Sequence, residues 1–260
     1  MKKTLYTLNV NNYAPEITRL TYPLLRHWAH KIGAEFEIIS KRKFPGWPVV
    51  YEKLQIYERG KLNDWNIYID SDALVHPDMF DPTDHLSGDT VAHNGQDMAG
   101  NRWRYDRYFR RDGRHIGSCN WLAVASELCI DLWKPLDDLT LDEALDNIFP
   151  TPHEQASVDF KRDEANQPVK DDKGEYIMVP KVIITREHLV DDYTLSRNIA
   201  KYGLKHTTIM QIQRQRADNG NYLWHGYTIT EEEKVKQIGK MMKAWQIEHF
   251  AERAQHASLP

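Results

Sequence analysis

Apolar positions follow two different periodicities in the first third of the chain. Short runs of β-favouring residues predict strands over residues 3–10, 35–40 and 67–69. Between the first two strands, apolar residues recur at helical spacing from Pro15, which suits the first turn of a helix, to Gly33, which ends it. A strand, a helix and a strand in this order predict an α/β fold with a mostly parallel central sheet flanked by helices.

The alternation of strands and helices continues to the end of the chain, so we expect residues 1–260 to form one domain. Further helices are expected over residues 50–57, 127–133, 139–148 and 191–203, and further strands over residues 90–93, 116–125 and 205–213. A charge-dense stretch predicts an exposed excursion at about 155–180. An amphipathic stripe predicts a C-terminal helix at about 230–254 that packs on the domain.

Composition narrows the class of protein. The chain has 260 residues, 41% of them hydrophobic, and a net charge of −4, which suits one large soluble domain and gives no reason to expect nucleic-acid binding. Its two cysteines, Cys119 and Cys129, make neither a disulfide framework nor a zinc site. No apolar run approaches the roughly 18 residues of a membrane span. We therefore expect a cytoplasmic protein with no membrane span.

Two carboxylates stand where the strand at 67–69 should end. Because side chains alternate across a strand, Asp70 and Asp72 share a face and converge on one point beyond the sheet edge. In open α/β sheets ligands bind outside the carboxyl ends of the strands. Two close carboxylates repel each other unless a positive group lies between them, and a divalent cation carrying a diphosphate is one such group. The alternative is that both merely cap the next turn or helix.

The segment Ile-Tyr-Ile-Asp-Ser-Asp-Ala-Leu-Val, residues 67–75, resembles the Asp-x-Asp segment of GT-A glycosyltransferases. In that family it binds the metal and the diphosphate of a nucleotide-sugar. The resemblance implies a GT-A fold, a metal-dependent glycosyltransferase with Mn²⁺ or Mg²⁺ as cofactor, a UDP-sugar as the expected donor, and a glycan or other hydroxyl as acceptor. Sugar, acceptor and stereochemistry stay open.

Two other functions remain for the same aspartates. Haloacid dehalogenase-like phosphatases also carry Asp-x-Asp after an apolar strand, but follow it with Gly-Thr where this chain has Ala73-Leu74. A phosphotransferase of that kind, using Asp70 and Asp72, is the alternative enzyme. A non-catalytic module that binds a nucleotide-sugar or a glycan is the alternative outside catalysis.

A second acidic pair opens the helix expected over 191–203. Residues 188–203 resemble the acidic-pair helix of GT-A enzymes, with Leu-Ser after the acids and Gly203 at the end. The resemblance implies that Asp191 or Asp192 is the catalytic base that deprotonates the acceptor hydroxyl in inverting members, and it slightly favours Asp192. Retaining relatives carry acids there too, and helix-dipole stabilisation is the alternative.

The resemblance also implies binding roles for polar residues near the strand ends. Thr7, Asn9 and Tyr13 correspond to the region that holds the nucleotide, and Lys53 to a basic residue offered to the donor, alongside Asp70. The alternatives are that Thr7, Asn9 and Tyr13 are ordinary polar residues of a loop and that Lys53 is a solvated charge on a helix.

The later candidates concern the sugar and the metal. Asn120 and Trp121 correspond to residues beside the donor or acceptor sugar, and His225 to a late histidine that closes the metal site. An imidazole with carboxylates suits Mn²⁺ better than Ca²⁺. Glu154 is a further candidate acid, because acidic-Gln pairs occur in some retaining relatives. The aromatic and basic stretch 94–114 could close over a diphosphate or be a surface excursion.

Overall fold

The computed structural model of this chain describes residues 1–95, 98–105, 115–149, 158–164, 167–180, 184–227 and 229–250. A six-stranded sheet lies at the centre, in the order β2-β1-β3-β6-β5-β9. Its strands are β1 (Lys3–Leu8), β2 (Ala34–Ile39), β3 (Trp65–Ile69), β5 (Thr90–His93), β6 (Leu122–Ser126) and β9 (Lys205–Thr208). Only β6 runs antiparallel to its neighbours within this sheet. The predicted α/β fold with a mostly parallel sheet is confirmed.

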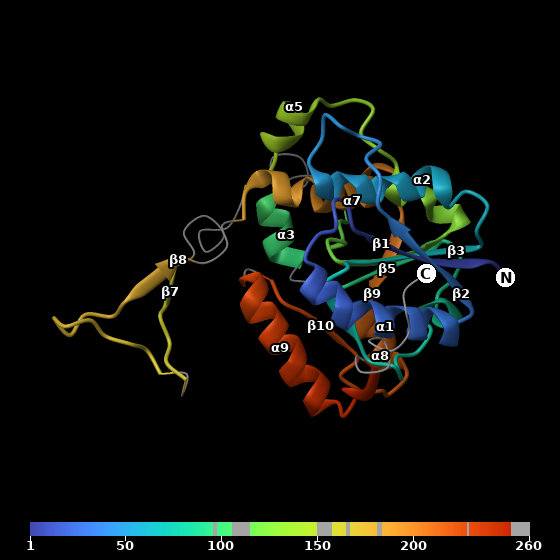
Figure 1. The fold of residues 1–260 in the computed structure, drawn as a ribbon. Helices are drawn as coiled ribbons and strands as arrows, with labels where there is room; N and C mark the ends of the chain where they lie inside the picture. The colour runs from blue at the N-terminus through green and yellow to red at the C-terminus, as the bar shows by residue number, and fades with distance from the viewer. Residues whose placement is uncertain are drawn as a thin grey trace.

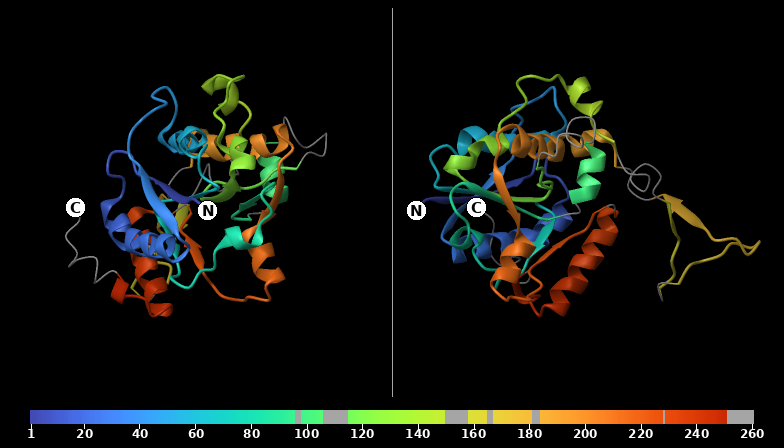
Figure 2. Two further views of the ribbon diagram at one scale, coloured as in Figure 1. Left: turned by 90° about the vertical axis from the view of Figure 1, so that its right-hand side faces the viewer. Right: turned by 180° about the vertical axis from the view of Figure 1, so that it is seen from behind.

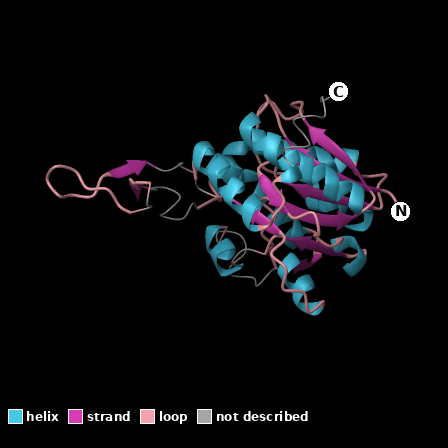
Figure 3. Ribbon diagram, turned by 60° about the horizontal axis from the view of Figure 1, so that its bottom comes forward, coloured by secondary structure: helices cyan, strands magenta, loops and turns pink. Residues whose placement is uncertain are grey.

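Helices cover both faces of the sheet (Figure 1 and Figure 3). On one face α7 (Val190–Lys201) packs with the 3₁₀ helices η1 (Val49–Gln55) and η3 (Glu127–Trp133) over a large apolar cluster. On the other face α1 (Pro15–Lys31) and α8 (Ile209–Gln215) bury a second cluster. The sheet is thus buried on both sides, and its strand ends are where polar groups can gather.

The remaining elements are short, with the exception of the C-terminal helix. They are α2 (Ile56–Arg59), β4 (Ala73–Val75), η2 (Pro82–His85), α3 (Met98–Arg104), α5 (Leu141–Leu145), β7 (Val158–Phe160), β8 (Met178–Pro180), η4 (Arg186–Leu189), β10 (Leu223–His225) and α9 (Glu231–Ala244). β4 and β10 pair antiparallel as a small separate sheet, and α9 packs against α1 and β4 through a third apolar cluster. This small sheet joins the C-terminal part of the chain to the end of β3.

The charge-dense stretch forms a two-stranded hairpin that projects away from the rest of the chain (Figure 1 and Figure 2). β7 pairs antiparallel with β8, and isolated bridges at Arg162–Pro168 and Lys170–Tyr176 close two separate local turns between these strands. Most side chains that the structure describes in this hairpin are exposed. The hairpin is therefore held by local pairing, with little apolar burial of its own.

The bounds of several expected elements differ from the structure. The strand expected over 205–213 ends at Thr208, because the Thr208 side chain accepts from the Gln211 amide in a capping box that starts α8. The strand expected over 116–125 begins only at Leu122. The C-terminal helix ends at Ala244, where Gln246 takes a left-handed conformation with φ of 58°, and residues 251–254 of the expected helix lie outside the described residues.

Among the described helices, none combines the length and apolar character that crossing a bilayer requires.

Candidate functional site

The loop that carries the first acidic pair leaves the sheet at the carboxyl end of β3. The amide of Asp70 donates to the Trp121 carbonyl at 2.9 Å, and the Ala73 amide donates back to the Asp70 carbonyl at 3.1 Å. The next element is the strand β4, so no helix begins here for Asp70 or Asp72 to cap. Neither side chain caps a helix, and the Asp70 carboxylate accepts a hydrogen bond from the Tyr68 hydroxyl of β3.

β10 brings His225 to this loop from the other end of the sequence. The register of the small sheet places His225 opposite Ala73, one residue after Asp72. One ligand atom each from Asp70, Asp72 and His225 lie within 4.8 Å of one another. The Nε2 atom of His225 is 3.3 Å from Oδ1 of Asp72 and 3.8 Å from Oδ2 of Asp70. Two carboxylates and an imidazole at this spacing form a donor set that fits Mn²⁺ or Mg²⁺.

Trp121 supports the histidine. Its ring stacks on the imidazole of His225, with centroids 5.3 Å apart and planes 11° from parallel. Trp121 also carries the carbonyl that binds the Asp70 amide. This residue, predicted to lie beside a sugar, thus fixes both a side chain and the backbone of the three-residue cluster.

Lys234 of α9 is a second positive group at the cluster. Its ammonium pairs with Oδ2 of Asp72, and both residues are only 7% exposed. Burial by itself would raise the pKa of Asp72, but His225 and Lys234 outweigh it and hold this pKa below its usual range. Asp72 therefore stays ionised, with one oxygen toward His225 and the other toward Lys234.

Lys53 connects the two acidic pairs. This residue is 2% exposed, its Nζ atom is 3.6 Å from Oδ1 of Asp70, and it forms an ion pair with Oδ2 of Asp191. Burial would lower the pKa of Lys53, but Asp191 and Asp70 outweigh it and raise the pKa above its ordinary value. Lys53 also donates to the Asn120 carbonyl, so the expected sugar-binding segment lies against the same ammonium. The buried cation places the start of α7 beside the end of β3.

The two acids at the start of α7 have different surroundings. Asp192 is fully buried, and its two oxygens accept from the Tyr105 hydroxyl and the Cys119 amide, each at 2.9 Å. Asp191 pairs with Lys53 through one oxygen, while the other is buried without a hydrogen-bond partner among the described residues. Burial raises the pKa of both carboxyls, that of Asp191 to about 6 against the opposing effect of Lys53. Only Asp191 thus has a carboxylate oxygen left for a ligand.

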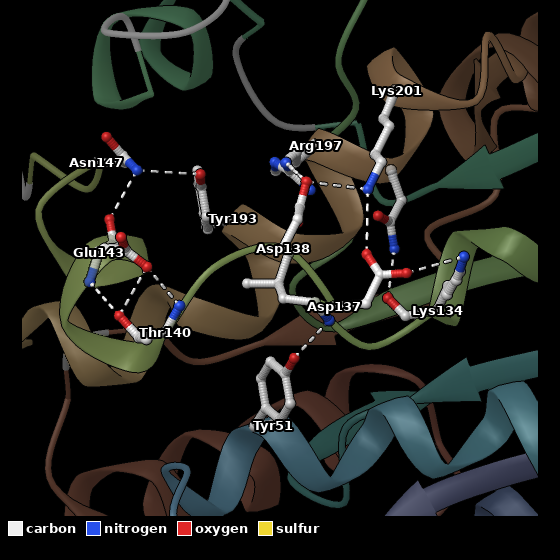
Figure 4. A network of polar contacts seen from close by, with 12 residues as sticks. Tyr51, Lys134, Asp137, Asp138, Thr140, Glu143, Asn147, Tyr193, Arg197 and Lys201 are labelled. Carbon is white, nitrogen blue, oxygen red and sulfur yellow. Dashed lines mark hydrogen bonds and ion pairs between the residues drawn. The ribbon is translucent and has the colours of Figure 1, made fainter.

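The far half of α7 is tied down by a polar network (Figure 4). Arg197 donates to Asp138 at 2.6 Å, and Lys201 contacts both Asp137 and Asp138. The Tyr51 hydroxyl accepts from the Leu136 amide at 2.8 Å, which joins this loop to η1 and thus to the element that carries Lys53. The network fixes the axis of α7 relative to η1, and so the distance between the acids and Lys53.

The expected nucleotide-binding residues lie at the end of β1 and in the loop after it. The Thr7 hydroxyl is buried without a partner among the described groups. The Asn9 side chain has two local partners. Its Nδ2 donates to the Tyr22 hydroxyl of α1, and its Oδ1 accepts from the Tyr13 backbone amide, both at 2.7 Å. The Tyr13 side chain is 53% exposed. Its hydroxyl lies near the first acidic pair, since partial burial and the charges of Asp72 and Asp70 raise its pKa to about 12.

Asn11, Asn12 and Ala14 in the same loop have positive φ angles. A left-handed conformation is unfavourable for Ala14, which lacks the local hydrogen bonds that ease it for Asn. The loop therefore holds Tyr13 in a fixed, strained turn next to the acidic cluster.

Lys234, Tyr68 and Tyr105 contact the two acidic pairs, although these contacts were not expected from the sequence. Lys234 shares the buried side of α9 with Ile238 and Met242, at spacings of four and eight residues, so a lysine on the apolar stripe was the available signal. Tyr105, which binds Asp192, has no comparable signal. Glu154 and residues 106–114 of the aromatic and basic stretch lie outside the described residues.

A cavity of about 650 Å³ lies apart from this cluster, between the end of α7 and the edge strand β9. Nε2 of His93 and Nδ1 of His206 are 3.0 Å apart at its wall. Burial lowers the pKa of His93 to about 3 and also lowers that of His206. No carboxylate lines the cavity among the described residues.

Comparison with known proteins gives matches of structure alone. No protein-family model matches the chain, and no curated protein sequence matches it. The structure is similar to that of a glycosyltransferase involved in the glycosylation of the major capsid of PBCV-1, with 9% identity, a TM-score of 0.47, and coverage of 92% of this chain and 100% of that one. It is also similar to the galactosyltransferase LgtC in complex with donor and acceptor sugar analogues, with 11% identity, a TM-score of 0.45, and coverage of 93% and 99%.

Proposed function

We propose that this protein is a metal-dependent glycosyltransferase that moves a sugar from a nucleotide-diphosphate donor to an acceptor hydroxyl. The observation that carries the proposal is the convergence of Asp70, Asp72 and His225 within 4.8 Å at the carboxyl end of β3. Lys53 links this cluster to a second, buried acidic pair. A cation site and a carboxylate with a free oxygen thus lie on either side of one buried ammonium.

The donor set supports a divalent cation at this place. Asp70, Asp72 and His225 would hold Mn²⁺ or Mg²⁺, and the imidazole favours Mn²⁺ over the harder cations. When bound, such a cation neutralises negative charge that develops on the departing diphosphate. The donor's nucleotide would lie over the β1 end, against Thr7 and the Tyr13 loop, with a UDP-sugar as the first donor to test.

Asp191 is the base in this proposal. It would accept the proton of the acceptor hydroxyl while the new glycosidic bond forms and the nucleoside diphosphate leaves, which is the course of an inverting reaction. Its free oxygen and its pKa of about 6 support this role. Lys53 orients the other oxygen. The carboxylate of Asp192 is already used by Tyr105 and the Cys119 amide, which supports a structural role for it.

A donor screen tests the proposal. Purified protein is incubated with UDP-, GDP- and other nucleotide-sugars, with MnCl₂ or with chelator, and nucleoside diphosphate is measured. We expect release that chelator abolishes, that Mn²⁺ restores, and that Asp72→Asn reduces by about 10²-fold or more.

The outcomes separate the three functions. Release of inorganic phosphate in place of nucleoside diphosphate would indicate the phosphotransferase. Binding of a nucleotide-sugar without turnover would indicate the non-catalytic module. Full activity in chelator, or in Asp72→Asn, would contradict the metal site.

A further inference from the structure

Lys234 has no role in the proposed chemistry, yet it is one of the most completely buried charges of the described chain. It lies in the second turn of α9, which packs beside α1 and β10 (Figure 1). Its neighbours on the same side of the helix are Ile238 and Met242, and its ammonium reaches Asp72 across 162 positions of sequence. A lysine desolvated to this degree needs a partner, because an unpaired buried ammonium is strongly unfavourable.

The carboxylates of the cluster are already paired with buried ammonium groups. Asp70 and Asp191 lie against Lys53, and Asp72 lies against Lys234. A divalent ion that arrives alone must compete with Lys234 for Asp72 and adds positive charge beside a buried ammonium.

A diphosphate changes this situation. If a cation takes over Asp72, the Lys234 ammonium loses its carboxylate and needs another anion. The α9 backbone is held by its own apolar contacts, so the ammonium stays near the cluster. A diphosphate carried by the cation is the anion that enters at this point.

We infer that Lys234 makes the cation and the diphosphate bind as a unit, opposing the cation when it comes alone and pairing with the diphosphate when both are present. This inference rests on the proposed function and adds a positioning residue to it. Lys234 acts through Asp72 in the free protein and on the diphosphate in the loaded one. The consequence is a site that binds the metal–nucleotide complex more tightly than the free metal ion.

Isothermal calorimetry on four proteins tests the inference: wild type, Lys234→Met, Lys234→Arg, and the control Lys236→Met. Met keeps the length of the side chain without its charge. Lys236 lies on the same helix but is exposed and pairs with Glu232, so the control changes the charge of α9 away from the site. MnCl₂ is titrated alone, and UDP is then titrated at saturating MnCl₂. A thermal melt of each variant shows that it is folded.

We expect two shifts of opposite sign in Lys234→Met. Affinity for Mn²⁺ alone should rise at least about fivefold, and affinity for UDP with Mn²⁺ should fall at least about fivefold, within the range of coupling free energies between sites. Lys236→Met should match wild type. Lys234→Arg, which keeps the charge, should restore both values toward wild type.

A purely structural ion pair gives a different pattern. If Lys234 only supports Asp72, its loss should weaken Mn²⁺ and UDP binding together, and that result would overturn the inference. Unchanged values in Lys234→Met would overturn it as well. Absence of any Mn²⁺-dependent UDP binding in the wild type would instead contradict the proposed function, so the two failures can be told apart.

Discussion

The two acidic pairs of this protein share one buried lysine but are built in opposite ways. Asp70 and Asp72 lie on a loop between two strands, and their partners are the Tyr68 hydroxyl and the side chains of Lys53, His225 and Lys234. Asp191 and Asp192 lie in the first turn of a helix, and Asp192 binds a backbone amide and a tyrosine hydroxyl. The first pair faces charged groups from distant elements, whereas the second is buried in the core.

This difference shows that burial and charge do not by themselves identify the reactive group. Asp192 is the more buried of the helix acids, yet all of its oxygens are satisfied by the protein. Asp191 differs by a single oxygen that no described residue pairs. An unpaired buried acceptor is rare in proteins, and it is the feature that points to a missing partner.

Replacement of Asp191 should have the largest effect. In Asp191→Asn we expect kcat for sugar transfer to fall by about 10² to 10⁴, because the acceptor hydroxyl loses its base. The affinity for Mn²⁺ with UDP should stay near that of wild type, in contrast with Asp72→Asn. Steady-state kinetics and calorimetry on the same preparation check both values. A near-normal kcat would remove Asp191 from the mechanism and move attention to Glu154.

The pH profile should show the same group in the unmodified enzyme. Burial raises the pKa of Asp191 to about 6, so the carboxyl is protonated below that pH and cannot accept a proton. We expect kcat to decrease on the acidic side of about pH 6, by about tenfold for each further pH unit. The profile is measured at saturating Mn²⁺ and donor. A kcat that stays level between pH 5 and 7 would argue against this base.

Replacement of Asp192 should affect stability more than catalysis. Asp192→Asn keeps the shape but weakens the hydrogen bonds from Tyr105 and the Cys119 amide, which should cost about 1–3 kcal/mol of unfolding free energy. In the folded fraction kcat should stay within a few-fold of wild type. Denaturant unfolding followed by kinetics in buffer measures the two effects separately. A large loss of kcat with unchanged stability would exchange the roles of the two aspartates.

The sequence by itself determined the class of fold and the first acidic pair. Strand and helix periodicity are local properties, so the βαβ start and the mostly parallel sheet could be predicted from short windows. The pattern Asp70-x-Asp72 after a strand could also be read from a short window, but both residues lie in the turn after β3, so it is the turn and not strand alternation that brings them together. The boundary of β9 was missed for an equally local reason, since the Thr208 capping box overrides the β-favouring run that contains it.

Only the tertiary structure decided how the site is assembled. The pairing of β10 with β4 brings His225 to Asp72, and the docking of α9 brings Lys234 to the same carboxylate, across about 150 positions or more of sequence in each case. The different proposed roles of Asp191 and Asp192 also depend on tertiary contacts. Asp191 pairs with Lys53, whereas Asp192 accepts from Tyr105 and the Cys119 amide. Such contacts leave no mark on the local pattern of a single sequence, since any residue with the same helical or strand preference would preserve that pattern.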